Sequence, residues 1–225
     1  MELLDEYTGH VDANGPAARR DLGAVSITKV SVGPMDNNAY VLVDHATGQA
    51  LLIDAANETD RLLDTVDTVA SRDALTHLVT THKHWDHIQS LEDVVAATSP
   101  RTYAGERDAP ELPVAPDVTV GDDDTQAFGD SFVEFIHIDG HTPGSIAIYY
   151  ADPQGTGHLF TGDSLFPGGH GKTDTRAHHD SLMDDLERKV FSRLADSTYV
   201  YPGHGDDTTL GAERPQLPEW RERGW

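Results

Sequence analysis

Short apolar runs separated by turn residues dominate the chain from Val25 onward. Runs rich in β-branched and aromatic residues predict strands at 25–31, 39–43, 50–53, 78–79, 102–104, 118–120, 132–138, 145–150, 158–161 and 199–201. Apolar residues that recur at helical spacing, such as Leu62 and Val66 or Leu182 and Leu186, predict helices over 58–71, 88–98 and 179–194. The pattern is that of a strand-rich α/β protein.

The two ends of the chain lack this regularity. Residues 1–22 show no clear period and are predicted to be irregular, and residues 206–225 are predicted to form a C-terminal tail. Between them there is no internal repeat, low-complexity tract or long linker. The sequence therefore predicts a single domain over residues 1–225, a length that suffices for one full core.

Composition excludes several classes of protein. There is no cysteine, so disulfides, thiolate nucleophiles and thiolate metal sites are excluded, and any metal must be held by imidazole and carboxylate groups. The net charge of −23 disfavours nucleic acid, because binding to phosphates depends on cationic side chains. No apolar run approaches the ~20 residues that span a bilayer, and the acidic start does not resemble a signal peptide. A cytoplasmic protein without nucleic-acid or membrane partners is expected.

The strongest chemical signal is the segment Thr81-His82-Lys83-His84-Trp85-Asp86-His87, which directly follows a predicted strand. In extended chain, His82 and His84 point to the same side, whereas the adjacent Asp86 and His87 diverge and can reach a second ion. The alternative is that Asp86 caps the helix expected from residue 88 while the histidines decorate a surface loop. The two roles of Asp86 are compatible.

Three further segments place a polar residue beside glycine after a predicted strand. They are Asp139-Gly140-His141-Thr142-Pro143-Gly144-Ser145, Phe160-Thr161-Gly162-Asp163-Ser164-Leu165-Phe166 and Tyr201-Pro202-Gly203-His204-Gly205. Glycine allows the sharp turns and close backbone approach that a bound ion requires. Each of these residues alone could be an ordinary turn residue, but four such segments in one chain favour a metal site.

Together the patterns H-x-H-x-D-H, G-H-T-P-G-S, T-G-D-S-L-F and P-G-H, over about residues 25–205, resemble the metallo-β-lactamase superfamily. The resemblance implies an αββα sandwich of two mixed sheets flanked by helices, with two metal ions in a groove at one edge. It implies that one ion is held by His82, His84 and His141. The second ion would be held by Asp86, His87 and His204, with Asp163 bridging both ions.

Imidazole and carboxylate ligands suit Zn²⁺, and also iron or manganese. Two divalent ions, two carboxylates and a bridging hydroxide leave a charge of about +1, which can stabilise an oxyanion. Metal ligation can lower the pKa of water from 15.7 to ~7, so no Ser or Cys nucleophile is needed. Asp86 is the candidate catalytic residue, since it can both ligate a metal and orient the hydroxide.

The stretch Leu165-Phe166-Pro167-Gly168-Gly169-His170-Gly171-Lys172-Thr173 resembles glyoxalase II (hydroxyacylglutathione hydrolase). There a lysine in a Gly-x-Gly-Lys segment helps to hold the carboxylate of the thiol carrier, and Lys172 matches it. His170 stands where the family usually has Cys and is expected close to the site, so Lys172 and His170 are candidate substrate-binding residues. About 20 residues follow His204, fewer than the helical extension that completes glutathione binding in full-length relatives.

A binuclear zinc hydrolase acting on a small-molecule thioester is thus the leading hypothesis for function. Lactone or ester hydrolysis is an alternative, because the same hydroxide attacks any activated acyl carbon. A persulfide dioxygenase with one iron near His82, His141 and Asp163 is another, since it has a loop similar to Gly171-Lys172-Thr173-Asp174. A non-catalytic metal-binding protein on this fold would have lost ligands, and none is missing here. The oligomeric state stays open, a homodimer included.

Overall fold

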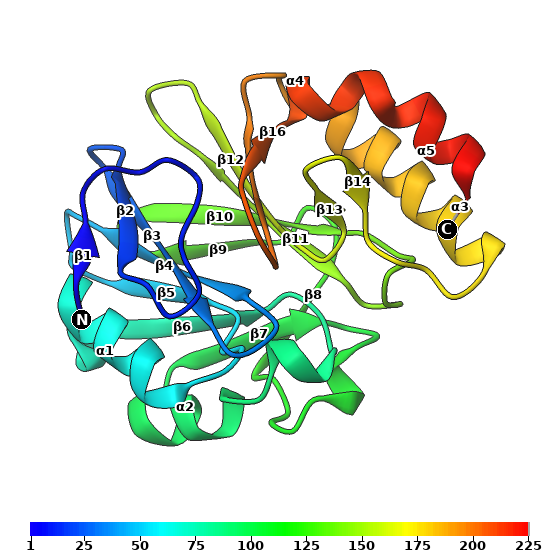
Figure 1. Cartoon of the computed structure of the whole chain (residues 1–225). Helices are drawn as coiled ribbons and strands as arrows, with labels where there is room; N and C mark the ends of the chain where they lie inside the picture. The colour runs from blue at the N-terminus through cyan, green and yellow to red at the C-terminus, as the bar shows by residue number, and fades with distance from the viewer. Residues whose placement is uncertain (225) are drawn as a thin grey trace.

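The computed structural model describes residues 1–224 as two β-sheets packed face to face, with helices on both outer faces (Figure 1). The first sheet contains, in spatial order, β1 (Leu3–Leu4), β2 (Ala17–Asp21), β3 (Val25–Val32), β4 (Asn37–Asp44), β5 (Ala50–Ile53), β6 (Leu75–Thr80), β7 (Arg101–Gly105) and β8 (Val118–Val120). The second contains β16 (Thr208–Thr209), β15 (Tyr199–Pro202), β12 (Gly157–Gly162), β11 (Ile146–Ala151), β10 (Ser131–His137) and β9 (Thr125–Phe128). A separate hairpin joins β13 (Leu165–Phe166) to β14 (Gly169–His170).

Both large sheets are mixed. In the first, β5 to β8 run parallel to one another, whereas β2 to β5 are antiparallel. In the second, the one parallel pair is β12 with β15. The α-helices are α1 (Thr59–Val69), α2 (Leu91–Thr98), α3 (Arg176–Asp185), α4 (Leu210–Glu213) and α5 (Leu217–Arg223), and α3 continues as a π-helical stretch over Leu186–Phe191. The expected pair of mixed sheets flanked by helices is confirmed.

Three apolar layers follow from the alternation of side chains along the strands. Residues such as Leu42 of β4 and Phe135 of β10 fill the space between the two sheets. The opposite face of the first sheet packs against α1 and α2, and that of the second sheet packs against α3 and α5. Strand β12 illustrates the alternation, because Phe160 points between the sheets while Leu159 points toward α3.

The strands and helices observed agree with most of the ranges predicted from apolar spacing, but both ends of the chain differ from expectation. The prediction that residues 1–22 are irregular is wrong for Leu3–Leu4 and Ala17–Asp21, which form β1 and β2. The predicted tail carries β16, α4 and α5, and Trp220 of α5 is fully buried in the core. Both ends owe their order to distant contacts, which a local pattern does not reveal. Trp225 lies outside the described residues.

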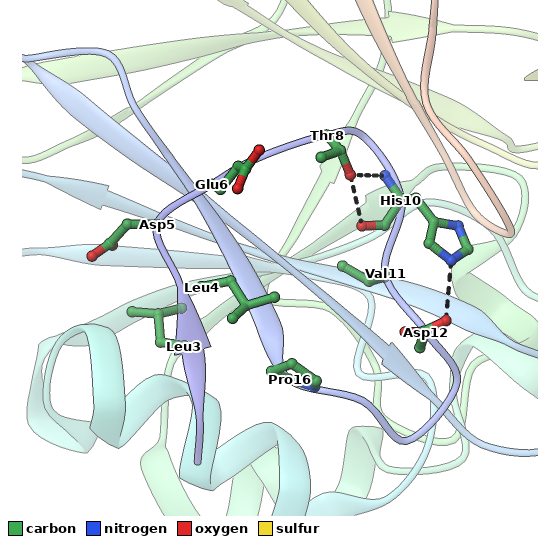
Figure 2. Close-up of a pocket in the computed structure, with 9 residues that line it drawn as sticks. All are labelled: Leu3, Leu4, Asp5, Glu6, Thr8, His10, Val11, Asp12 and Pro16. Atoms are coloured by element: carbon green, nitrogen blue, oxygen red, sulfur yellow. Dashed lines mark hydrogen bonds and ion pairs between the residues drawn. The ribbon is translucent and has the colours of Figure 1, made fainter.

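The N-terminal segment crosses the first sheet and reaches the loop that follows β15. Figure 2 shows part of this segment, from Leu3 to Pro16, curving around a hollow. The fully buried ammonium group of Lys29 on β3 donates to the carbonyl oxygens of Gly9 and Gly205 and to the carboxylate of Asp207. The hydroxyl of Tyr7 donates to the same carboxylate at 2.6 Å. One buried ion pair therefore ties the start of the chain to the loop that carries His204.

Among residues 1–224, no helix is both long and apolar enough to cross a lipid bilayer.

Strand β10 offers a direct test of the inter-sheet layer, because it carries one buried and one exposed phenylalanine. Phe135 is fully buried between the sheets, whereas Phe132 is 57% exposed. We expect Phe135→Ala to lower the free energy of unfolding by about 3–5 kcal/mol, because it leaves a cavity in the core. Phe132→Ala should change it by less than about 0.5 kcal/mol. Urea denaturation of both variants measures the difference, and equal losses would contradict the assignment of the core.

Candidate metal centre

Seven side chains with metal-binding capacity meet at one edge of the two sheets. His82, His84, Asp86 and His87 follow β6 of the first sheet. His141 follows β10, Asp163 follows β12 and His204 follows β15, all in the second sheet. The backbone N–H of Ile146 donates to the carbonyl of Thr81 at 2.9 Å and so joins the two sheets beside the cluster. All seven metal ligands expected from the sequence are therefore brought together.

The first group of ligands consists of His82, His84 and His141. Their nearest ligand nitrogens all lie within 4.8 Å of one another. The ring centroids of His84 and His141 are 4.5 Å apart, and those of His82 and His141 are 5.0 Å apart. The Nε2 atoms of His82 and His141 are buried and have no hydrogen-bond partner among the described residues. Buried nitrogens of this kind are what a metal ion would satisfy.

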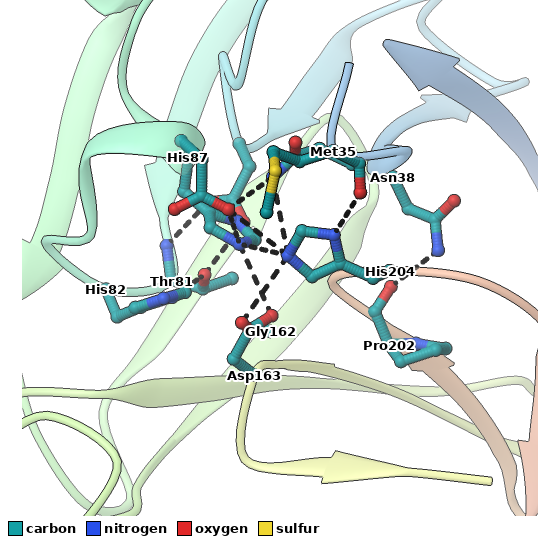
Figure 3. A network of polar contacts seen from close by, with 12 residues as sticks. Met35, Asn38, Thr81, His82, His87, Gly162, Asp163, Pro202 and His204 are labelled. Carbon is teal, nitrogen blue, oxygen red and sulfur yellow. Dashed lines mark hydrogen bonds and ion pairs between the residues drawn. The ribbon is translucent and has the colours of Figure 1, made fainter. Parts of the chain in front are cut away.

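The second group consists of Asp86, His87 and His204, which also meet within 4.8 Å. The Nε2 atom of His204 lies 3.3 Å from Oδ2 of Asp86 and 3.2 Å from Nε2 of His87. Asp163 lies between the two groups, since its Oδ1 is 3.3 Å from Nε2 of His87 and its Oδ2 is 3.7 Å from Nε2 of His141. Figure 3 shows Asp163 close to His87 and His204. Imidazoles and carboxylates converging in this way fit two divalent cations with a shared carboxylate.

Each of four imidazoles uses its Nδ1 for a contact with the protein, which directs Nε2 toward the cluster. His141 donates to the carbonyl of Lys172 at 2.8 Å. His204 donates to the carbonyl of Met35 at 2.9 Å, as Figure 3 shows. Nδ1 of His87 lies 2.9 Å from the carboxylate of Asp54, and Nδ1 of His82 lies 3.0 Å from Oγ1 of Thr81. Such outer contacts fix the tautomer and the orientation of metal-binding histidines.

The protonation states reflect the crowding of the cluster. Burial lowers the pKa of His82 well below its usual range, and burial also lowers the pKa of His84. Burial opposes protonation of His87 too, but hydrogen bonds with Asp163 and Asp54 prevail and raise its pKa to about 10. Despite burial, contacts with His204 and His87 hold the pKa of Asp163 far below its usual range. The carboxylate is therefore ionised and available as a ligand at neutral pH.

Glycine makes the close approach of the loops possible. A Cβ atom on Gly203 would collide with Oδ1 of Asp163 and lie 2.7 Å from the ring of His87. A Cβ atom on Gly171 would collide with the backbone carbonyl of Asp163. The glycines beside His204 and Lys172 thus allow two loops to pack directly against metal-ligand residues.

Comparison with known proteins identifies the family. Residues 32–204, well over half of the chain, match the model of the metallo-beta-lactamase superfamily. The chain belongs to this superfamily. Its members share a metallo-hydrolase fold, and the matched segment contains all seven residues of the cluster.

Several relatives within the superfamily are similar over most of this chain. Hydroxyacylglutathione hydrolase of Roseobacter denitrificans is 35% identical over 75% of this chain and 62% of its own length. This chain spans about half to three-fifths of the hydroxyacylglutathione hydrolases that it matches. The structure of ETHE1 from Myxococcus xanthus is 29% identical, with a TM-score of 0.76 over 87% of this chain and 84% of that protein. TTHA1623, solved in a di-iron-bound form, is 29% identical, with a TM-score of 0.69 over 83% of this chain and 96% of that one.

Asp86 has no capping role in this member of the superfamily. Helix α2 begins at Leu91, three residues later than expected, and Ser90 occupies the position before it. Residues Trp85–His87 instead form a single 3-10 turn. The carboxylate of Asp86 accepts a hydrogen bond from Nδ2 of Asn37 at 3.0 Å and faces His204. The alternative that Asp86 serves only as a helix cap is therefore wrong.

The two expected substrate-binding residues lie in different environments. Lys172 is exposed, and its ammonium group forms no hydrogen bond or ion pair with residues 1–224. His170 is 8% exposed, donates through Nδ1 to the carbonyl of Gly171, and packs against the rings of His179 and Trp220. Lys172 is thus open to a ligand, whereas His170 supports the loop from inside the protein.

Two buried aspartates near the cluster escaped the sequence analysis. Asp54, directly after β5, accepts hydrogen bonds from N and Oγ1 of Thr81 and faces His87. Asp108 accepts from the backbone N of Lys83 and of Gly144 and from Oγ1 of Thr142, so it joins two metal-binding loops. Asp54 repeats the pattern of a polar residue at a strand end, which is the one signal that could have identified it.

The contact between Asp54 and His87 leads to a test on metal content. In Asp54→Asn the neutral amide no longer stabilises the required orientation and basicity of His87, so we expect metal affinity to fall by roughly 10–100-fold. Metal per chain, measured against a competing chelator, reports this loss. Asp44→Asn serves as the control, since Asp44 is an equally buried aspartate that accepts hydrogen bonds from Ser131 and Thr47. Equal metal retention in the two variants would contradict the role of Asp54.

Proposed function

We propose that this protein is a binuclear zinc-dependent hydrolase that cleaves a small-molecule thioester of the hydroxyacyl-thiol kind. The proposal includes a single domain and a cytoplasmic location. The observation that carries it is the pair of ligand groups, each within 4.8 Å, with Asp163 between them. Partial similarity to hydroxyacylglutathione hydrolases supports the choice of substrate class. Hydrolysis of lactones or simple esters would use the same site.

The donor set determines what a bound metal would contribute. His82, His84 and His141 would hold one ion, Asp86, His87 and His204 the other, and Asp163 both. Bound divalent ions would polarise an acyl carbonyl and lower the pKa of a water molecule to about 7. The chain itself supplies no cysteine nucleophile, which agrees with a mechanism in which metal-activated water is the nucleophile.

Asp86 offers a proton acceptor at the site. Its Oδ2 is engaged by Asn37 and faces His204, whereas its Oδ1 forms no hydrogen bond with residues 1–224. That oxygen can hold a proton taken from the attacking water and can deliver it to the leaving group. Asn37 keeps the carboxylate oriented while the proton moves.

Lys172 is the proposed anchor for an anionic substrate. The chain has four lysines, and Lys29, Lys83 and Lys189 each pair with a carboxylate. Only the ammonium group of Lys172 lacks such a partner within the described part of the chain. Its backbone carbonyl accepts a hydrogen bond from His141, so the lysine sits next to a metal-ligand residue. A carboxylate on the thiol carrier would find its counter-charge there.

A second candidate function is a persulfide dioxygenase with a single iron. Its supporting observation is the set of His82, His141 and Asp163, two imidazoles and one carboxylate, a combination typical of non-haem iron oxygenases. Asp86, His87 and His204 would be dispensable for that reaction. Metal analysis separates the two functions, because two ions per chain favour hydrolysis and one iron with oxygen consumption favours the dioxygenase.

Asp86→Ala tests the hydrolase directly. We expect thioester turnover to fall by about 10²–10⁴-fold, because the proton acceptor and one metal ligand are lost, while the melting temperature stays near that of the parent protein. Glu92→Ala, which removes an exposed acidic side chain from α2, is the matched control. Near-normal turnover of Asp86→Ala would refute the assigned role, and retained oxygen consumption would favour the dioxygenase.

Lys172→Gln tests the substrate anchor. For a thioester whose carrier bears a carboxylate, we expect KM to rise by roughly 10-fold or more, because a charge-assisted hydrogen bond is lost. The KM for a neutral thioester should change little. Arg72→Gln, which removes a cation from a surface ion pair with Asp67, is the control. A similar KM change for both substrates would show that Lys172 does not recognise the carboxylate.

A further inference from the structure

A second hollow lies at the end of β12 and β15 that is remote from the metal centre. It has a volume of about 510 Å³, and its walls include Tyr7, Arg20, Leu22, Asp152, His158 and Tyr199. His158 and Tyr199 begin the same two parallel strands whose far ends lead to Asp163 and His204. At ~3.3 Å per residue, the five residues from His158 to Asp163 span about 16 Å. The hollow is therefore separate from the proposed active site.

Arg20 in this hollow is a guanidinium without a hydrogen-bond acceptor. Its Cζ lies 3.8 Å from the ring centroid of Tyr199 and 4.5 Å from that of Tyr7, so the charge rests on two aromatic rings. The side chain is half-buried, yet none of its five N–H groups bonds to a residue in the range 1–224. Arginines that are partly buried normally satisfy these donors. The edge of the guanidinium is thus available to a ligand.

His158 lines the same hollow as a buried side chain. Its ring is 1% exposed, and burial lowers its pKa to about 4, so the imidazole is neutral. Its Nδ1 lies 2.8 Å from the hydroxyl of Tyr201, and burial raises the pKa of Tyr201 well above its usual range. This contact holds the imidazole ring in place. Nε2 has no partner among the described residues.

The carboxylates around the hollow already have donors. Asp5 pairs with Arg19 at 2.6 Å, and Asp21 accepts from the backbone N of Gly23 at 2.7 Å. Asp152 accepts from the backbone N of Gln154 at 3.0 Å. The hollow therefore has one charged donor group without an acceptor among residues 1–224, the Arg20 guanidinium, together with aromatic and aliphatic walls from Tyr7, Tyr199 and Leu22.

We propose that this hollow binds a small organic carboxylate. The carboxylate lies in the plane of the Arg20 guanidinium, whose N–H groups donate to its two oxygens in a bidentate manner. The apolar body of the ligand rests against the tyrosine rings. A volume of about 510 Å³ accommodates a small molecule of this kind. The site is distinct from catalysis and requires no metal.

Nitrogen NMR of the metal-loaded, full-length protein tests the proposal with benzoate as the probe. We expect saturable changes in the signals of the His158 imidazole and the Arg20 side chain. The neutral isostere benzamide should cause none, because it lacks the charge that the guanidinium recognises. Changes confined to residues near the metals, or equal changes with benzamide, would overturn the proposal.

Two variants of Arg20 complete the test. Arg20→Gln should weaken benzoate binding at least 10-fold. Arg20→Lys retains the positive charge but cannot form two parallel hydrogen bonds to a carboxylate, so it should also weaken binding. Arg101→Gln is the matched control, since Arg101 also lies over a tyrosine ring, at 5.9 Å from the centroid of Tyr103. Turnover at the metal centre should remain unchanged in all three variants. Undiminished benzoate binding by Arg20→Gln or Arg20→Lys would contradict the proposal, whatever the outcome for the hydrolase.

Discussion

The apolar layer between the two sheets is the constraint on which the metal centre depends. Side chains such as Phe135 and Phe160 hold the sheets together, so the loops after β6 and β12 meet at one edge. The hydrogen bond from Ile146 to Thr81 joins the sheets beside that edge. Five imidazoles and two carboxylates are expensive to desolvate without compensation. The core supplies the rigidity that keeps them together in the absence of any disulfide.

Local patterns predicted much of this arrangement. Alternating apolar residues located most strands, because a strand with one face on the inter-sheet layer must alternate. The ligands were recognisable because four of them cluster just after one strand, and the other three each follow a strand and stand next to glycine. Gly203 shows why the glycine matters, since a side chain there would collide with Asp163. The backbone geometry of these loops and the chemistry of metal binding thus require the same residue types at the same positions. Such a pattern can be recognised from the sequence alone.

Features that depend on distant partners could not be predicted. Strand β2 was missed because Arg19 and Arg20 interrupt the apolar alternation, and its order comes from pairing with β3. The burial of His170 follows from its packing against Trp220, fifty positions later in the chain. Asp54 follows a strand but has no flanking glycine and no histidine nearby in sequence. Its importance became visible only through its contact with His87.

The parallel strands β12 and β15 run between the two proposed sites, which require ligands of opposite charge. At their carboxyl ends, Asp163 and His204 converge with ligands whose lone pairs call for cations. At their amino ends, a hollow contains the Arg20 guanidinium, which calls for an anion. In a chain of net charge −23, an arginine that forms no salt bridge within residues 1–224 is conspicuous, because carboxylates are plentiful. Two tyrosine rings occupy the positions where a neutralising carboxylate could have been, which leaves the guanidinium edge for a ligand from outside.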